Sequence, residues 1–172
     1  MNYKIYGERN SGTNYLQCLI DKNTFGLTNY VCFKGEELLN WKHTFISHNK
    51  KVNFNALVIY KNIYPWLISQ WEKPHHIHNP EKDFDKFVKT KWPTIPEENY
   101  NLEFLNPIDL WNQKNLNYRT NLKTIAKKVF FIRYEDLLAD PESIIKKILP
   151  NNTNANFINC IEGVSPGTKK RL

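Results

Sequence analysis

The residues best suited to chemistry lie in a short glycine-bounded turn, GERNSGTN, which runs from Gly7 to Asn14. A β-type run, NYKIYG, leads into this turn, and apolar residues at helical spacing follow it between Tyr15 and Ile20. A turn from strand to helix directs several backbone N–H groups and the positive end of the helix dipole toward one place. The sequence therefore predicts a cradle for a phosphate or sulfate group.

The turn has the outer glycine spacing of a Walker A loop but lacks the side chains that act on the nucleotide and the metal. Thr13 stands where the Walker loop has its lysine, and Asn14 stands where it has the Ser or Thr that holds Mg²⁺. These changes disfavour magnesium-dependent hydrolysis of a nucleoside triphosphate, but they do not oppose binding of a phosphate-like group. A P-loop kinase of a small substrate is one alternative, and an ordinary strand-to-helix turn with polar caps is a simpler one.

Strand and helix patterns alternate along most of the chain. The apolar run ALVIYK, at 56–61, is typical of a strand buried on both faces, and YPWLISQW after it has a helical pattern. VFFIRY, at 129–134, predicts another buried strand, and DPESIIKKIL predicts a helix with Asp140 as N-cap and Pro141 in the first position. This alternation predicts an α/β fold in three layers, with a central parallel sheet flanked by helices.

A further helix is expected from Pro107 to near Lys127. Positive charge at Lys127 and Lys128 would complement the negative end of its dipole. Its apolar face is expected to contain Ile108, Trp111, Tyr118, Leu122 and Ile125.

The remaining segments carry weaker signals. Short β-type patches lie at 29–33 and 41–47. Residues 73–107 include five prolines and are expected to be irregular, apart from a short helix around 83–91. Because no repeat or low-complexity linker divides the chain, we expect a single domain over residues 1–172.

Composition limits the partners. With 24 Lys and Arg against 17 Asp and Glu, the formal charge of the 172 residues is +7, which favours anionic ligands. Lysines are spread along the chain instead of being gathered with aromatic residues into a stripe, so no nucleic-acid partner is expected. No apolar stretch is long enough for a membrane span and none follows Met1 as a signal segment, so no membrane association and a cytoplasmic location are expected.

Cysteine and histidine do not indicate a metal site. Three widely spaced cysteines, Cys18, Cys32 and Cys160, fit neither a disulfide framework nor a zinc ligand set and are expected to be reduced thiols. Three histidines in KPHHIHNP, at 73–80, have no carboxylate or Cys at ligand spacing, so no metal is expected there either. This segment is expected to be a surface loop or a lid over an acceptor pocket.

Three segments, in this order, resemble the sulfotransferases that use 3′-phosphoadenosine 5′-phosphosulfate (PAPS). RNSGTNYL, at 9–16, is similar to the 5′-phosphosulfate loop of that family. Lys61 and Asn62 at a strand end, with Ser69 eight residues beyond Lys61, resemble its 3′-phosphate site, and FIRYEDLLADPESI, at 131–144, resembles the strand and helix with its YED element. The resemblance implies a P-loop NTPase-like sulfotransferase fold. It also implies transfer of a sulfuryl group from PAPS to an unknown hydroxyl or amine acceptor, with PAPS as donor substrate and no metal.

The resemblance also implies which residues bind the donor. Tyr15 takes the position of a Trp that stacks on adenine in the family, although a plain helix-core role fits its sequence equally well. Lys61 and Ser69 would bind the 3′-phosphate, and Tyr134 would approach the adenine. The residues expected around the 5′-phosphosulfate are Arg9, Asn10, Ser11, Gly12, Thr13 and Asn14.

Catalysis would need a base and a cation. His43 is the candidate base, because its ordinary pKa lies near neutral pH and many cytosolic members have Lys-x-His after the first helix; here Lys42 and His43 are adjacent. The family commonly has Lys or Arg directly before Ser-Gly-Thr to neutralise the bridging oxygen, whereas this chain has Asn10. Arg9 and Lys42 are the candidate substitutes. If neither serves, the alternative is a nucleotide-binding module with the same fold and weak or no catalytic activity.

Overall fold

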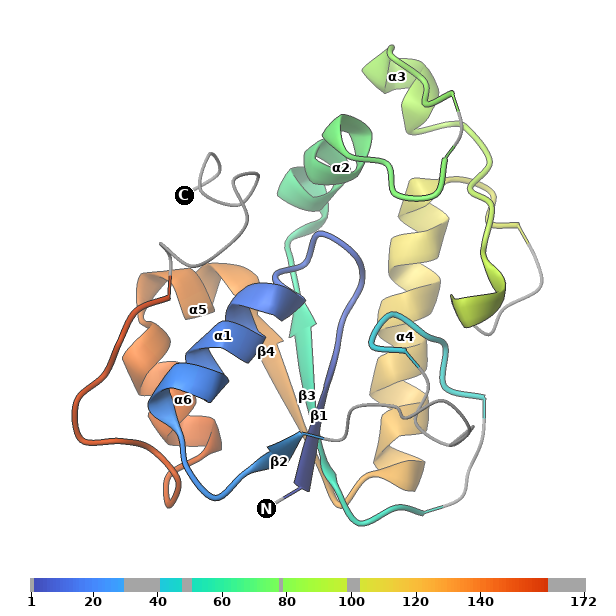
Figure 1. Cartoon of the computed structure of the whole chain (residues 1–172). Helices are drawn as coiled ribbons and strands as arrows, with labels where there is room; N and C mark the ends of the chain where they lie inside the picture. The colour runs from blue at the N-terminus through green and yellow to red at the C-terminus, as the bar shows by residue number, and fades with distance from the viewer. Residues whose placement is uncertain (1, 30–40, 48–50, 78, 99–102, 161–172) are drawn as a thin grey trace.

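The computed structural model of the chain describes residues 2–29, 41–47, 51–77, 79–98 and 103–160 (Figure 1). Its centre is a parallel sheet of four strands in the order β2-β1-β3-β4. The strands are β1 (Asn2–Tyr6), β2 (Thr28–Asn29), β3 (Asn55–Tyr60) and β4 (Lys128–Arg133). The predicted α/β fold with a parallel sheet is confirmed.

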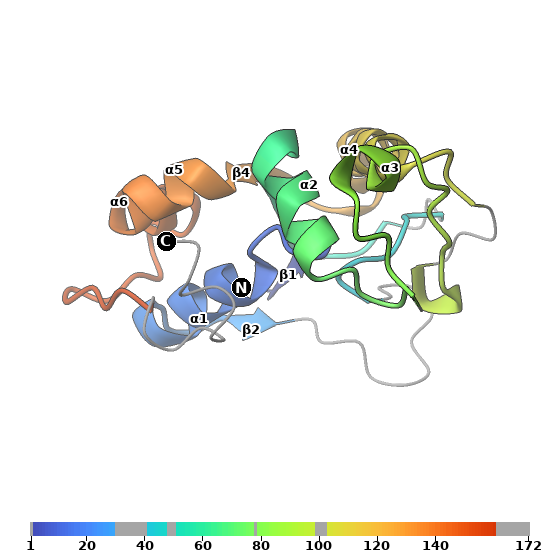
Figure 2. The same ribbon diagram turned by 90° about the horizontal axis from the view of Figure 1, so that it is seen from above.

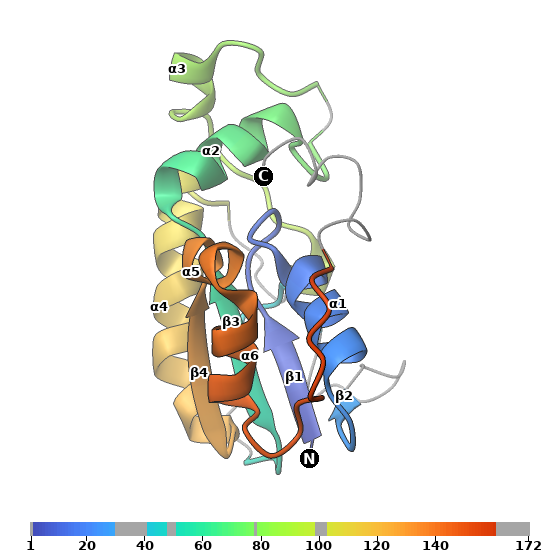
Figure 3. The ribbon, with the colours of Figure 1, turned by 90° about the vertical axis from the view of Figure 1, so that its left-hand side faces the viewer.

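Helices cover both faces of the sheet, which gives the three expected layers (Figures 1 and 3). On one face lie α1 (Thr13–Asn23), α5 (Tyr134–Ala139) and α6 (Pro141–Ile148). On the other face lies α4 (Pro107–Ile125). Figure 2 shows α2 (Ile63–Glu72) crossing above the carboxyl ends of the strands. Among the described residues, no helix is long and apolar enough to cross a membrane.

The central strand β3 is buried on both faces, as its sequence predicts. Leu57 and Ile59 pack into the core cluster beneath α1, α5 and α6. Ala56 and Val58 alternate with them and pack into the cluster beneath α4. Strand β3 therefore contributes to both core clusters, one on each face of the sheet. Its packing on both faces fixes the position of its carboxyl end at Tyr60.

Strand β4 differs from its expectation, because it is an edge strand. It pairs with β3 on one side only, and of its six residues only Ile132 is buried. Phe131 is 37% exposed. The expectation of another buried strand is therefore met only at Ile132, since an apolar sequence shows that a strand packs against something but not where the strand stands in the sheet.

Helix α4 forms where it was predicted, and its buried face agrees with the prediction in part. Its N-cap Asn106 accepts a hydrogen bond from the Asp109 backbone N–H at 2.9 Å. Ile108, expected on the apolar face, is 36% exposed. Tyr118, Leu122 and Ile125 are buried as expected. The helix also buries Pro107, Leu110 and the charged side chain of Lys114, which the sequence analysis did not include.

The segment 41–47 is not a strand. Its backbone bonds to loop and side-chain partners instead of to a ladder: Phe45 N–H donates to the Glu98 carbonyl at 2.7 Å, and Ile46 N–H donates to Asn117 Oδ1 at 2.8 Å. Most of the other weak patch, 29–33, lies outside the described residues. The irregular character of 73–107 is confirmed where the chain is described, with α3 (Phe84–Phe87) and a short 3₁₀ turn, η2 (Pro96–Glu98).

The described cysteines are free thiols. Cys18 lies on α1 and Cys160 is buried in the same core cluster. Burial, reinforced by the neighbouring Cys18 thiol, raises the pKa of Cys160 to about 12, which disfavours the reactive thiolate. The expectation of reduced thiols is confirmed for this pair, and Cys32 lies outside the described residues.

Candidate functional site

The turn between β1 and α1 has the strand-turn-helix geometry that its sequence predicts. Gly12 is the N-cap of α1 and has a φ of 96°, a left-handed conformation that favours glycine. A Cβ at Gly12 would lie closer than 3.0 Å to atoms of the Tyr134 ring. Gly12 has no side chain to cap the helix, and N–H groups at the start of an uncapped helix are able to bind an anion.

Two polar side chains of the turn are bonded within the protein. The Ser11 hydroxyl donates to the Glu8 carbonyl, and Ser11 is buried. The Asn10 amide donates to the carbonyls of Ser69 at 3.2 Å and Lys73 at 3.3 Å, which ties the turn to α2. Thr13 is also buried. In this structure the backbone, more than these side chains, therefore presents hydrogen-bond donors to an anion.

Arg9 is held inside the protein. Its guanidinium Nη2 lies 2.8 Å from Glu98 Oε1, and the side chains are 5% and 0% exposed, respectively. The Arg9 carbonyl accepts hydrogen bonds from Trp66 Nε1 at 2.8 Å and Gln70 Nε2 at 3.1 Å. With its charge paired to a buried carboxylate, Arg9 holds the turn against α2 and η2 instead of presenting a free cation to a ligand.

Lys42 is the candidate cation that lies beside the turn. Its ammonium group donates to Asn14 Oδ1, so its charge stands at the first turn of α1. Burial lowers the pKa of Lys42 from its ordinary value. Of the two predicted substitutes for the missing loop lysine, Lys42 is the better placed.

His43 is buried directly against the turn. Its ring Nδ1 lies 2.5 Å from the Gly7 carbonyl oxygen, and Gly7 N–H donates to the Lys42 carbonyl at 3.1 Å. Because a carbonyl only accepts, Nδ1 carries the proton and Nε2 keeps its lone pair. Burial lowers the pKa of His43 to about 3, although Glu8 and the Gly7 carbonyl act in the opposite direction. The imidazole is therefore neutral at neutral pH and in the tautomer that accepts a proton at Nε2.

The structure brings three other predicted site residues together. Lys61 Nζ lies 3.0 Å from Ser69 Oγ and 5.2 Å from the centre of the Tyr134 ring. The Ser69 hydroxyl in turn donates to the Pro65 carbonyl at 2.8 Å. A cavity of about 250 Å³ adjoins them, lined by Lys61, Pro65, Ile68, Ser69, Glu72, Tyr134, Glu135 and Leu138.

The charged side chains that line this cavity are one cation and two carboxylates, a formal excess of one negative charge. Its lining contains Lys61 and two carboxylates, Glu72 and Glu135. Glu135 accepts from the Asn62 backbone N–H at 3.0 Å and pairs with Arg133 at 3.3 Å. Lys61 and its hydroxyl partner Ser69 are thus the groups that would select an anion here.

Tyr15 occupies the core in this structure. It is 1% exposed, and its hydroxyl donates to Asn159 Oδ1 at 3.0 Å. Its ring meets that of Tyr134 edge to face at 6.5 Å, and burial raises its pKa to about 12. This arrangement favours the helix-core alternative over stacking on adenine, whereas Tyr134 lines the cavity.

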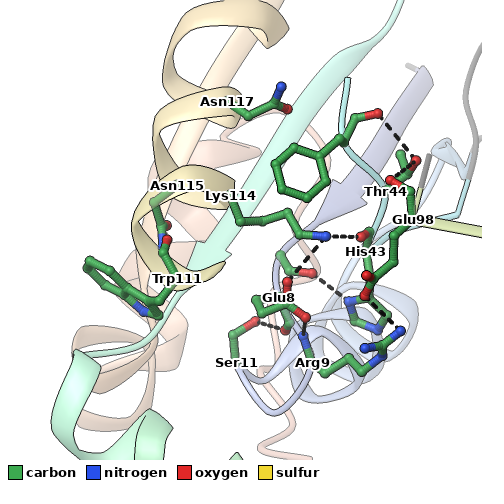
Figure 4. A network of polar contacts seen from close by, with 12 residues as sticks. Glu8, Arg9, Ser11, His43, Thr44, Glu98, Trp111, Lys114, Asn115 and Asn117 are labelled. Carbon is green, nitrogen blue, oxygen red and sulfur yellow. Dashed lines mark hydrogen bonds and ion pairs between the residues drawn. The ribbon is translucent and has the colours of Figure 1, made fainter. Parts of the chain in front are cut away.

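Three buried charged residues in and around the turn were not identified from the sequence. They are Glu8, Glu98 and Lys114, and Figure 4 shows them. Lys114 Nζ lies 3.3 Å from Glu8 Oε2 and donates to the His43 carbonyl at 2.5 Å. Burial favours a high pKa for Glu8, but Lys114, His43 and Arg9 outweigh it and lower that pKa. The available signal was the place of Lys114 on the buried stripe of α4, four residues from both Leu110 and Tyr118.

The histidines of 73–80 do not form a metal site in the part of the chain that the structure describes, where no group of three metal-ligating side chains occurs. His75 and His76 are exposed, and the His76 ring lies 6.2 Å from the Trp41 ring, edge to face. His78 lies outside the described residues. This segment therefore borders the side of the turn where Trp41 and His43 meet, at 4.6 Å between ring centres.

Comparisons with known protein families, with curated proteins and with solved structures found no match in any of the three.

Proposed function

We propose that this chain is a PAPS-dependent sulfotransferase with a P-loop NTPase-like sulfotransferase fold. The observation that carries the proposal is the contact of Lys61 Nζ with Ser69 Oγ at 3.0 Å, beside a cavity that Tyr134 also lines. The Tyr134 ring lies against Gly12 of the turn. The two segments that resemble the ends of a PAPS site thus lie on either side of one aromatic ring.

The donor would span these two positions. Its 5′-phosphosulfate would bind the backbone N–H groups at the start of α1, with Lys42 as the nearby cation. Its 3′-phosphate would bind the Lys61 ammonium group, and it would bind the Ser69 hydroxyl once that hydroxyl turns away from the Pro65 carbonyl. Tyr134 would contact the adenine or ribose between them.

Transfer would follow an in-line path. The acceptor oxygen or nitrogen forms a bond to sulfur while the bond from sulfur to the bridging oxygen of the donor breaks, and 3′-phosphoadenosine 5′-phosphate leaves. The acceptor proton passes to His43 Nε2, whose lone pair is free for it because Nδ1 donates to Gly7. Negative charge of the bound donor would raise the pKa of His43. Lys42 would neutralise the charge that grows on the bridging oxygen.

A second candidate is a nucleotide-binding module of the same fold without transfer activity. It is favoured by Asn10, whose amide is tied to the Ser69 and Lys73 carbonyls at the position where sulfotransferases commonly have a cation. The pairing of Arg9 with Glu98 favours it as well. Both candidates predict donor binding, and only the first predicts release of 3′-phosphoadenosine 5′-phosphate from PAPS.

Calorimetric titration with 3′-phosphoadenosine 5′-phosphate, ADP and Mg-ATP tests the proposal without knowledge of the acceptor. Selective micromolar binding of the 3′-phosphorylated nucleotide, about −8 kcal/mol, is the result expected. A preference for Mg-ATP would favour the kinase alternative, and failure to bind any of the three would refute a nucleotide site. Incubation of the protein with PAPS and a panel of hydroxyl and amine compounds then separates an enzyme from a binding module.

A further inference from the structure

A network of buried charges lies beneath the turn, and its members come from three distant parts of the chain (Figure 4). Glu8 and Arg9 belong to the turn, Glu98 to η2 and Lys114 to α4. All four side chains are at most 5% exposed. Two carboxylates and two cations cancel in formal charge, which is the condition under which such groups are tolerated in an interior.

Lys114 is the member that joins the turn to the segment of the candidate base. Its single ammonium group lies 3.3 Å from Glu8 Oε2 and 2.5 Å from the His43 carbonyl oxygen. It also lies 4.2 Å from the centre of the Phe45 ring, two residues beyond His43. Being 0% exposed, Lys114 cannot exchange these partners for bulk water.

The His43 ring completes a closed loop of contacts. Its Nδ1 donates to the Gly7 carbonyl at 2.5 Å, and Glu8 Oε1 accepts from the Arg9 backbone N–H at 2.7 Å. Gly7 and Glu8 are adjacent, so His43 is held to one short piece of the turn from two sides. The His43 ring bonds directly to the Gly7 carbonyl. The His43 backbone carbonyl is linked to the Glu8 carboxylate through the Lys114 ammonium group.

We propose that Lys114 is a positioning residue for His43. By holding the His43 carbonyl and the Glu8 carboxylate with one ammonium group, it keeps the ring turned so that Nδ1–H meets Gly7 and Nε2 is the proton acceptor. The use of Nε2 as a catalytic base rests on the proposed function. The position and tautomer of the ring do not, and they can be measured without any donor.

Long-range ¹H–¹⁵N NMR of the imidazoles is the direct test, with the His43 signals assigned through a His43→Asn variant. In the wild type we expect a single neutral tautomer with the proton on Nδ1. In Lys114→Met we expect the proton to be shared between Nδ1 and Nε2, because the hydrogen bond from the Lys114 ammonium group to the His43 carbonyl is lost. Lys123→Met, on the exposed side of the same helix, is the matched control and should retain the wild-type tautomer.

Lys114→Met leaves the Glu8 carboxylate buried without its cation, so this variant can fail to fold for that reason alone. The double variant Glu8→Gln/Lys114→Met removes both charges and still lacks the ammonium group that holds His43. It should fold and show the same shared tautomer. A wild-type proton on Nε2, or an Nδ1 proton retained in the double variant, would overturn the proposal.

Titration with 3′-phosphoadenosine 5′-phosphate separates this inference from the proposed function. If the wild type binds the nucleotide, the double variant should retain that affinity, because Lys114 contacts neither the start of α1 nor Lys61. Its transfer rate should fall by about a hundredfold, the size of a general-base contribution. If the wild type does not bind the nucleotide, the proposed function fails, while the NMR result still decides whether Lys114 positions His43.

Discussion

Lys61 Nζ and Ser69 Oγ lie 3.0 Å apart, although Lys61 directly follows strand β3 and Ser69 lies within helix α2. The turn between them is short because Asn62 caps α2, accepting from the Tyr64 backbone N–H at 3.1 Å. The helix then brings its second turn back over the strand end. A spacing of eight residues in the sequence thus becomes an ammonium group and a hydroxyl that meet beside one cavity.

Gly12→Ala should destabilise the protein more than alanine at another left-handed glycine. At Gly26, whose φ is 63°, a Cβ would meet only Asn152 at 3.6 Å, so Gly26→Ala is the matched control. We expect Gly26→Ala to lower the free energy of unfolding by about 1 to 2 kcal/mol through backbone strain. Gly12→Ala should cost about 2 kcal/mol more, because the added methyl group overlaps the Tyr134 ring. Equal free energies of unfolding in urea for the two variants would contradict this contact.

Lys114→Met should be severely destabilised, by about 3 to 5 kcal/mol, because it leaves a carboxylate buried without a cation. The Glu8→Gln/Lys114→Met variant should recover most of this loss, since neither charge remains. The measurement is the free energy of unfolding from urea denaturation at neutral pH. Additive losses in the double variant would show that the 3.3 Å pair does not couple the two residues.

Acid should destabilise the protein through His43. Its pKa falls from 6.5 to about 3 on folding, mainly through burial, so the unfolded chain binds a proton that the folded protein does not. The stability that follows from this difference is complete above the unfolded pKa, 6.5, and is lost as the pH falls toward about 3. His43→Asn, whose amide can still donate to Gly7, should have a flatter slope of unfolding free energy between about pH 5 and 7. An unchanged slope would contradict the neutral buried state of His43.

Replacement of Lys42 should slow sulfuryl transfer, whereas replacement of Arg9 should lower the stability of the protein. Lys42→Met removes a half-buried cation that bonds to Asn14, so we expect normal stability and about a hundredfold slower release of 3′-phosphoadenosine 5′-phosphate from PAPS. Arg9→Met should lower stability instead, because Glu98 then lies buried without its partner. Intact turnover in Lys42→Met would remove Lys42 from the mechanism.

Much of the fold was predictable because local signals and tertiary packing agree. The run at 56–61 is apolar because β3 stands between two strands and beneath helices on both faces. The turn between Gly7 and Asn14 was recognisable from its two glycines, neither of which has room for a side chain. The edge position of β4 was not predictable, since strand order depends on which segments pair across long distances in the sequence.

The candidate site was predictable only in part, because local patterns in the sequence reveal local structure but not contacts between distant residues. The resemblance to a family motif pointed to Lys61 and Ser69, and local structure brings the two together, because one follows a strand and the other lies on the next helix. The roles of Arg9 and Lys114 depend on carboxylates about 90 and 106 positions away, Glu98 and Glu8, whose burial no local pattern reveals. Arg9 therefore seemed available to a ligand in the sequence, whereas the structure pairs it within the protein.

The most direct test of the central claim is the affinity gained from a 3′-phosphate, measured by calorimetry with 3′-phosphoadenosine 5′-phosphate and adenosine 5′-monophosphate. We expect the wild type to bind the first nucleotide more tightly, and Lys61→Ala to lose about 1.5 to 3 kcal/mol of that difference, the contribution of a hydrogen bond to a charged group. Lys82→Ala, on the exposed surface, should retain it. Equal wild-type affinities for the two nucleotides, or an undiminished difference in Lys61→Ala, would contradict a 3′-phosphate site at Lys61 and Ser69 and with it the proposed donor.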